Sequence, residues 1–405
     1  MQESAAMYGI DKRIQYHHKL ISSDWSDAEQ QWTHTIEADG ETKTYTARFT
    51  IFGTGYYDYN KPLEAKIPGL ENFKGQTIHP QFWPQDLDYK GKKFAVIGSG
   101  ATAITLIPNL VDKGAEKVTM VQRSPTYIVS LPQRDPTGDF VGKVFPTWLA
   151  HRIVRLKFLI LPFLFFKFCR NFPGAAKKGL RKQTAKQIPD NVPIDPHFTP
   201  KYNPWEQRLC VCPDGDFYKS LSSGKASVVT DNIDKVTEKG ITMKNGQKID
   251  VDIIVTATGL KMMMIGGAKL TINGKPVAFN DKFLWKGVML QDVPNACVVL
   301  GYTNASWTLG ADTTAEMVCR LMRHMDAHGQ SSCVPRVPTD TKMKPQNVLN
   351  LSSTYIVKAK GELPKAGDQA PWLPRENYLT DYPRAIYGEL TNELEFAYPG
   401  EQKVY

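Results

Sequence analysis

The sequence predicts an α/β fold built around a βαβ unit with a parallel sheet. An apolar strand, FAVI at 94–97, is followed directly by a glycine-rich turn and an apolar-periodic helix, AITLIPNLV. A second strand, KVTMVQR, ends at Arg123, which is the distance expected for one βαβ unit. The N-terminal part adds short alternating strands of the antiparallel kind. Together these patterns place the chain in the α/β class.

The other elements follow in chain order. Three alternating strands are expected in IQYHHKLISSDW, QWTHTIEA and TKTYTARFTIFGTG, with a hairpin at Asp39-Gly40. An aperiodic linker rich in Pro and Gly leads to the βαβ unit, and residues 140–200 are basic and helical in pattern. Two more hairpins are expected around Asn245-Gly246 and in TINGKPVAFNDKF. A helix is expected to start near Ala311, and the Pro-rich tail holds one expected strand, STYIVKA.

Composition narrows the class of protein. The 405 residues are 41% hydrophobic, no apolar run reaches the length of a membrane span, and the N-terminus lacks the layout of a signal peptide. The six scattered cysteines favour a reducing cytoplasm, and the single residue between Cys210 and Cys212 does not fit a metal site. The net charge of +9 is concentrated between Asp139 and Asp190, where no acidic residue occurs. This local concentration argues against a general nucleic-acid binder.

The glycine-rich turn has the spacing of a dinucleotide-binding loop. Gly98, Gly100 and Ala103 occupy the G-x-G-x-x-[GA] positions, where they permit a tight turn, close approach of a diphosphate and close helix–strand packing. The N–H groups from Ser99 to Thr102 are expected to face the phosphates at the helix N-terminus. An ordinary strand-to-helix turn is the alternative interpretation.

The end of the second strand indicates which nucleotide is preferred. An NAD site usually has Asp or Glu there, whereas this chain has Arg123 and Ser124. A guanidinium and a hydroxyl suit a 2′-phosphate, so Arg123 is the candidate for NADPH selectivity. A surface arginine at a strand end is the alternative.

The linker carries the pattern on which a family resemblance rests. The stretch FKGQTIHPQFWP places Phe73, Gly75, His79 and Trp83 in F-x-G-x-x-x-H-x-x-x-W-P, just before the glycine-rich turn. With FGTGYY, VTATGL and YNPWEQRLC, it resembles the Baeyer–Villiger monooxygenases, which belong to the class B flavoprotein monooxygenases. The segments QRSPTYIVS and GYTNASWTL are similar to the ethionamide-activating type of mycobacteria.

This resemblance implies two Rossmann-like domains and the cofactors FAD and NADPH. The expected reaction uses O₂: NADPH reduces the flavin, and a C4a-peroxyflavin transfers one oxygen atom to a small apolar ketone, sulfide or amine. The implied FAD domain comprises residues 1–88 and 254–405. The implied NADPH domain comprises 89–253, with a basic helical insertion at about 131–205.

The resemblance also implies roles for individual residues. Arg208 matches the active-site arginine of the family, and a salt-bridged structural arginine is the alternative. Gly55, Asn304 and Trp307 are expected near the flavin, with Ser306 in the same loop; a helix cap and ordinary packing are the alternative. His79 is expected to anchor the linker or to couple it to the nucleotide, rather than to carry protons.

A second dinucleotide loop is missing from the sequence. Gly53 and Gly55 are followed by aromatic residues and no helical pattern, so the FAD domain is expected to be incomplete at its N-terminus. Three explanations stay open. The chain is a fragment, or a natural short form that binds NADPH but is catalytically silent, or a protein that binds FAD in another way.

The segment at 152–174 has two possible roles. It is apolar from Phe158 to Phe166 apart from Pro162, and Lys and Arg flank it, which suits an interfacial helix on anionic lipid. A lid over the substrate channel is the other interpretation, and the two are compatible. The expected location is therefore cytoplasmic, with peripheral membrane contact as an option.

Overall fold

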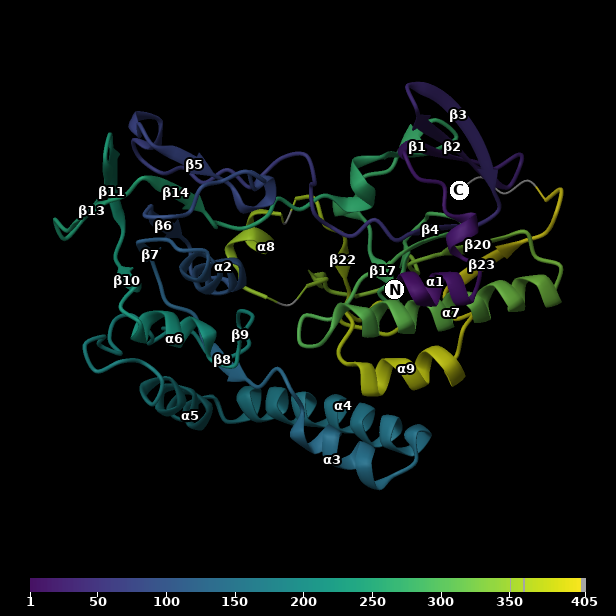
Figure 1. The fold of residues 1–405 in the computed structure, drawn as a ribbon. Coiled ribbons are helices and arrows are strands. Elements are labelled where there is room, and N and C mark those ends of the chain that lie inside the picture. The colour runs from purple at the N-terminus through teal and green to yellow at the C-terminus, as the bar shows by residue number, and fades with distance from the viewer. Residues whose placement is uncertain (350, 360, 402–405) are drawn as a thin grey trace.

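The computed structural model describes residues 1–349, 351–359 and 361–401, and one half of the molecule, drawn at the left of Figure 1, is built on a parallel sheet. The strand order is β10-β7-β6-β14-β5, and all neighbours run parallel. These strands are β5 (Gln76–Ile78), β6 (Lys93–Ile97), β7 (Lys117–Gln122), β10 (Ala226–Thr230) and β14 (Ile253–Thr256). Helix α2 (Ala101–Asp112) connects β6 to β7, as the sequence predicted.

The parallel sheet is covered on both faces. One apolar cluster joins the sheet to α2 and to α6 (Asp216–Ser222), and a second cluster joins it to the three-stranded sheet of β11 (Ile233–Thr237), β12 (Gly240–Met243) and β13 (Lys248–Asp250). This double burial explains why β6 is a continuous apolar run and not an alternating one. It fixes the carboxyl end of β6, where the glycine-rich turn begins.

The N-terminal strands belong to two further sheets. The first has the order β16-β15-β1-β2-β3, with β1 (His18–Ser26), β2 (Gln31–Ala38), β3 (Glu41–Ala47), β15 (Lys269–Ile272) and β16 (Lys275–Pro276). The second has the order β17-β18-β19-β4, with β4 (Thr50–Phe52), β17 (Leu284–Trp285), β18 (Met289–Leu290) and β19 (Ala296–Val298). The long helix α7 (Trp307–Ala327) packs against α9 (Tyr378–Tyr387) beside them.

The basic segment forms a helical layer along one edge of the molecule. Its helices are α3 (Pro136–Val144), α4 (Thr147–Asn171) and α5 (Pro173–Ala185), drawn at the bottom of Figure 1. The chain enters this layer through β8 (Ile128–Leu131) and leaves it through β9 (Cys210–Pro213), and these two strands pair in parallel. The β8–β9 pair is therefore one attachment of the insertion, and residues after α5 form another, since Gln122 of β7 donates to the carbonyl of His197.

The remaining elements are short. They are α1 (Gln2–Met7), β20 (Ser332–Pro335), β21 (Gln346–Asn347), α8 (Thr354–Lys358), β22 (Lys365–Ala366), β23 (Leu394–Ala397) and the 3₁₀ turns η1 (Asp11–Arg13), η2 (Leu70–Asn72), η3 (Pro80–Phe82), η4 (Met264–Gly267) and η5 (Phe279–Asp281). Within the described part of the chain, no helix combines the length and the apolar character needed to cross a bilayer.

Most expected elements are confirmed, and three differ. The helical pattern expected for 140–200 ends with α5 at Ala185, and no helix follows it up to residue 200. The Asp39-Gly40 turn joins β2 to β3 with both residues at positive φ, as a two-residue hairpin requires. The expected strand STYIVKA is wrong, because Thr354–Lys358 is the helix α8. Ile356 and Ala359, three residues apart, are buried together there, and a short apolar run does not distinguish a strand from a buried helix. Helix α7 starts at Trp307, four residues before Ala311.

The domain boundaries at 88/89 and 253/254 stay predictions. Strand β5 comes before the first boundary and β14 spans the second, and both pair within the sheet that contains β6. Residues 402–405 of the expected FAD domain lie outside the described residues.

Candidate functional site

The glycine-rich turn is closed tightly against the end of β14. Gly98 has a φ of 136°, and a Cβ there would lie 2.2 Å from the carbonyl oxygen of Ala257. Its N–H donates to the carbonyl of Val121 at 2.9 Å, which joins the turn to β7. Both the backbone conformation and the contact distance therefore require glycine at this position.

The helix that follows the turn presents an open N-terminus. Gly100 is the N-cap of α2, and a Cβ at this position would meet no atom within 4 Å. Thr102 in the first turn is exposed, whereas Ala103 is completely buried against the sheet. The free N–H groups and the helix dipole therefore face unfilled space, which fits the diphosphate of a dinucleotide.

The end of β7 lies beside this open helix end. The hydroxyl of Ser99 donates to the carbonyl of Ser124 at 2.9 Å, which holds the two turns together. Arg123 is exposed and takes part in none of the salt bridges among the described residues. Its neighbour Gln122 is buried and bonded to Thr230. The structure thus leaves the exposed guanidinium of Arg123 next to the turn that carries the open helix end.

The linker motif is built into the parallel sheet. Phe73 is buried, and a Cβ on Gly75 would lie 2.2 Å from the carbonyl oxygen of Asp252, just before β14. The indole N–H of Trp83 donates to the hydroxyl of Tyr89 at 2.7 Å, and Trp83 packs on the core beneath α2. Together, Phe73, Gly75 and Trp83 fix the path of the linker toward the glycine-rich turn.

His79 caps the short turn η3. Its Nδ1 accepts the N–H of Gln81 at 3.3 Å, and burial lowers the pKa of the imidazole while the nearby backbone of Gly259 opposes that shift. The Gln81 amide in turn donates to the carbonyl of Asp58 at 2.7 Å. A neutral His79 thus sits where the linker meets the loop that follows Gly55.

Asp58 organises that loop, and the sequence analysis missed it. The buried carboxylate accepts the N–H groups of Asn60 at 2.9 Å and Lys61 at 3.1 Å, and it pairs with Lys261 at 3.3 Å. Burial opposes ionisation, but these donors together lower the pKa of Asp58. The D-x-N spacing of an Asx turn is the sequence signal that would have indicated this role.

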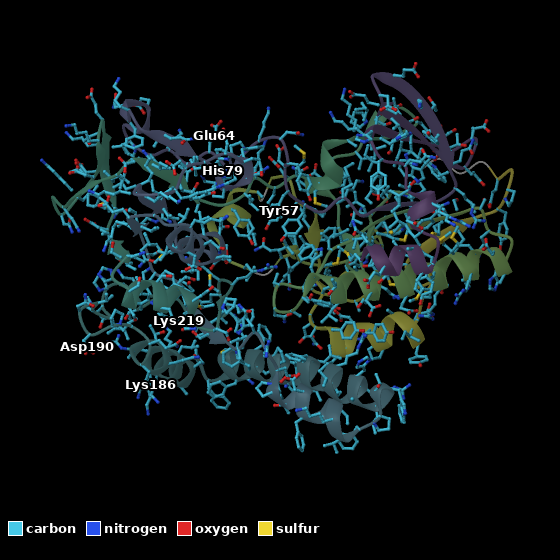
Figure 2. The ribbon with its side chains drawn as sticks, viewed as in Figure 1. Tyr57, Glu64, His79, Lys186, Asp190 and Lys219 are labelled. Carbon is cyan, nitrogen blue, oxygen red and sulfur yellow. The ribbon has the colours of Figure 1, made fainter. Side chains whose placement is uncertain are left out.

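Arg208 lies at one side of an aromatic cluster. The guanidinium is exposed and donates to the carbonyl of Tyr302 at 3.4 Å. Burial raises the pKa of Tyr57, and the charge of Arg208 opposes that shift, so the two groups are close enough to interact. Tyr57 lies near the centre of the molecule in Figure 2, between the parallel sheet and the α7 half.

The same cluster includes Trp307. The Tyr57 hydroxyl donates to that of Tyr56 at 3.1 Å, and the Tyr56 ring stacks on Trp307 with centroids 4.5 Å apart. Gly55, which precedes them, has a φ of 70° and takes the chain from β4 into this cluster. The structure therefore gathers Gly55, Trp307 and Arg208, three residues that lie far apart in the sequence.

The loop before α7 is held by a contact of Asn304 to a backbone carbonyl and by the partly buried cation of Arg375. Asn304 donates to the carbonyl of Glu376 at 3.1 Å, and Ser306 is the N-cap of α7 without a capping hydrogen bond from its side chain. Arg375 is partly buried and donates to the carbonyls of Leu300 at 2.8 Å and Gly310 at 2.6 Å. This clamp was not foreseen, because nothing in the local sequence distinguishes Arg375 from a surface arginine.

A cavity of about 650 Å³ lies between α4, α7 and α9. Helix α4 lines it with five apolar residues: Phe158, Leu159, Pro162, Phe163 and Phe166. The opposite wall includes Asn304, Ser306 and Leu309, which connects the cavity to the Trp307 loop. Its volume lies within the range of about 300–1,000 Å³ that is usual for small-molecule sites.

Three polar side chains join α4, which covers the cavity, to the opposite wall of the cavity. The Arg155 guanidinium donates to the Tyr378 hydroxyl at 2.9 Å, and that hydroxyl donates to Asp312 at 2.7 Å. Arg155 also pairs with Asp312 at 3.5 Å. One residue each from α4, α7 and α9 thus meets at the rim of the cavity.

The fold and the site define a nucleotide-binding α/β protein. Its apolar cavity is lined in part by an arginine, Arg155. A family model, "Flavin-binding monooxygenase-like", matches residues 1–151. The chain is 45% identical over 393 residues to the FAD-containing monooxygenase EthA of Mycolicibacterium smegmatis, with 97% of this chain and 80% of the relative covered. It is 44% identical over 382 residues to the probable FAD-binding monooxygenase AlmA of Acinetobacter baylyi, with 94% and 76% covered.

Solved structures share the same fold. An oxidized steroid monooxygenase bound to NADP matches with a TM-score of 0.71 at 18% identity, with 98% of this chain and 83% of that chain covered. A cyclohexanone monooxygenase from Rhodococcus sp. Phi1 bound to NADP⁺ matches with a TM-score of 0.67 at 17% identity, with 98% and 83% covered. The sequence relatives show that the chain belongs to the flavin-binding monooxygenase-like family.

Proposed function

We propose that this protein is an FAD- and NADPH-dependent monooxygenase that inserts one oxygen atom into a small apolar molecule. The observation that carries the proposal is the open N-terminus of α2 at Gly100, next to the exposed cation of Arg123. Relatives named as FAD-containing monooxygenases and structures bound to FAD and NADP support the choice of cofactors.

The proposed NADPH site uses both turns at the end of β6 and β7. Gly98, Ser99, Gly100 and Thr102 would surround the diphosphate with backbone and hydroxyl groups, and Ala103 would let the helix approach the sheet. Arg123 and Ser124 would bind the 2′-phosphate, because a guanidinium is attracted to an anion that a carboxylate would repel.

The proposed reaction centre is the cluster around Arg208. Gly55, Asn304 and Trp307 would border the flavin ring, and Phe73, Gly75, His79 and Trp83 would hold the linker between the two nucleotides. A bound flavin supplies hydride acceptance and oxygen activation. The Arg208 guanidinium would stabilise negative charge that develops beside it, since a cation placed next to a developing anion lowers the energy of that anion. The FAD diphosphate is assigned to none of the described residues.

The cavity beneath α4 is the proposed site for the substrate. Its apolar wall suits a ketone or sulfide with hydrocarbon substituents, and Asn304 and Ser306 would orient the polar atom. We also propose that residues 152–174 contact membranes peripherally, since this segment carries exposed apolar and basic side chains.

Purification of the chain and its visible spectrum test the flavin part of this proposal. We expect flavin absorption bands and substrate-dependent oxidation of NADPH. A colourless protein that still binds NADPH would contradict the proposal and favour the catalytically silent alternative.

The Arg123→Ala variant tests the choice of NADPH. Loss of one charge-assisted contact is expected to weaken NADPH binding about 10- to 100-fold while leaving NADH nearly unaffected, measured by isothermal titration. The neighbouring exposed residue Ser124 offers a matched control as Ser124→Ala, which keeps the cation and should cost less. An equal loss for NADPH and NADH in Arg123→Ala would remove Arg123 from the site.

A further inference from the structure

Helix α4 has a second face that no other part of the described chain covers. Leu161, Leu164, Phe168 and Phe172 are spaced by three or four residues, so they share one side of the helix, and all four are exposed. The cavity residues Leu159, Phe163 and Phe166 follow the same spacing on the other side of α4. Helix α4 is therefore apolar on both faces, and its cavity face is the one turned toward α7 and α9.

Helix α3 extends the exposed apolar surface. It packs against α4, and its Phe140 and Val144 are exposed. We call the six residues Phe140, Val144, Leu161, Leu164, Phe168 and Phe172 the docking face. Monomeric soluble proteins rarely expose large apolar patches, so the row of exposed apolar side chains on α4 indicates contact with an apolar partner.

The positive charge around the docking face indicates which kind of apolar partner binds there. From residue 140 to residue 189 the sequence holds eleven Lys and Arg and no Asp or Glu. Six of these cations are exposed and form no salt bridge within the described part of the chain: Lys143, Arg152, Arg170, Lys178, Lys182 and Lys186. Figure 2 places Lys186 at the lower edge of the molecule, near α5 in Figure 1. Asp139 precedes Phe140, but cations outnumber acidic groups in this segment, and apolar side chains with an excess of cations match the surface of an anionic bilayer.

The mouth of the cavity adjoins this face. Phe158 and Pro162 line the cavity and are themselves exposed, so the cavity reaches the surface along α4. Phe158 lies three residues before Leu161, on the side of the helix between the cavity and the docking face. A molecule dissolved in a bilayer beneath the docking face would meet the cavity without crossing bulk water.

We infer that the docking face binds anionic membranes and that the cavity receives apolar substrates directly from the bilayer. The second half of this inference rests on the proposed function. The substrates would then be molecules with a hydrocarbon chain that partition into lipid, and the apolar wall of α4 would accept that chain.

Vesicle sedimentation tests the docking face with the full chain. We expect the protein to sediment with phosphatidylcholine vesicles that contain phosphatidylglycerol, to stay in solution with pure phosphatidylcholine, and to be released by salt. The triple variant Leu161→Ser, Leu164→Ser, Phe168→Ser should lose at least about tenfold in vesicle affinity. Lys178→Ala with Lys182→Ala should lose about fivefold for each charge removed.

The matched control is Tyr387→Ser, which removes an exposed aromatic residue from α9, outside the docking face, and should sediment like the unaltered protein. Equal binding to neutral and anionic vesicles, no binding at low salt, or normal binding by the triple variant would each overturn the docking face.

Turnover separates the two halves of the inference. We compare a short water-soluble ketone with a long-chain ketone dissolved in anionic vesicles. The triple variant should oxidise the first at the normal rate, which also shows that it is folded, and the second at least about tenfold more slowly. Equal rates of the triple variant and the unaltered protein on the vesicle-borne ketone would overturn loading from the bilayer. Absence of turnover with both ketones would contradict the proposed function, while sedimentation still decides the docking face.

Discussion

Individual glycines show how differently the same residue type is used in this site. Gly98 is needed for the fold, because its φ is positive and Ala257 leaves no room for a side chain. Gly100 has open space in front of it, so its lack of a side chain serves no contact within the protein. The sequence motif treats both glycines alike, and only their surroundings separate a structural role from a binding role.

These surroundings predict opposite outcomes for two substitutions. Gly98→Ala should destabilise the protein by about 1–3 kcal/mol, because a Cβ would overlap a carbonyl oxygen. Gly100→Ser should change stability by less than about 0.5 kcal/mol, since serine is also a good N-cap, while reducing NADP⁺ affinity about tenfold or more by filling the phosphate space. Urea denaturation and calorimetric titration measure the two effects. Normal NADP⁺ affinity in Gly100→Ser would show that the diphosphate binds elsewhere.

At the scale of elements, α4 depends on distant partners for its position. It is attached to the parallel sheet through β8 and β9, yet its cavity side faces α7 and α9 of the other half. The contacts that span this gap include the Arg155–Tyr378–Asp312 triad and the ion pair of Lys167 with Glu376 at 3.3 Å. Helix α4 is therefore a cover whose closure depends on a few polar contacts at its rim.

Removal of one hydroxyl should loosen this cover. Tyr378→Phe deletes the contacts to Arg155 and Asp312 and keeps the ring, so opening of α4 should become easier by about 1 kcal/mol. Amide hydrogen exchange along α4 should then be about fivefold faster, with little change in the parallel sheet. Tyr387→Phe on the same helix is the control, because that side chain is exposed. Unchanged exchange in α4 would show that apolar packing alone keeps the cover closed.

At the scale of the whole molecule, segments far apart in sequence are joined by charged networks. Asp292, between β18 and β19, pairs with Lys282 at 2.7 Å and with Arg336 at 2.8 Å, and Arg336 extends to Glu395 at 2.9 Å. Burial of Asp292 opposes ionisation, but the two cations together lower its pKa. The C-terminal strands are thereby tied to the sheet that leads into the Trp307 loop.

This network predicts a pH-dependent contribution to stability. The folded-state pKa of Asp292 lies below its unfolded value, so its stabilising effect is complete above about pH 4 and is lost as the pH falls through the folded-state pKa. Asp292→Asn should lower the free energy of unfolding by about 1–2 kcal/mol at neutral pH, and the difference should shrink in acid. Urea denaturation across this pH range measures it, with the exposed Asp190→Asn as control. If the difference in free energy of unfolding between Asp292→Asn and the unaltered protein stayed constant with pH, the effect would come from packing.

Much of the local structure follows from the sequence because its causes are local. The G-x-G-x-x-[GA] turn, the Asp39-Gly40 hairpin and the helical nature of residues 136–185 depend on residues close in the chain. The prediction of a strand in STYIVKA was wrong for the opposite reason. The conformation of this segment is decided by the residues that bury Ile356, and these are distant in the sequence. Arg375 was missed because its importance comes from contacts with segments that the sequence does not place beside it. Asp58 has a local Asx-turn signal that was overlooked, and only its pairing with Lys261 depends on a distant segment.

The sequence by itself therefore determined the βαβ unit, its glycine-rich turn and the family to which the chain is similar, since these are encoded by spacing within short segments. Only the tertiary structure decided that Tyr56, Tyr57 and Trp307 pack together and that Arg208 bonds to Tyr302. It also decided that α4 has one face on a cavity and another left uncovered. The physical reason is that side-chain burial is a property of the packed chain. Contacts across hundreds of residues are fixed by how sheets and helices stack, and no local pattern records them.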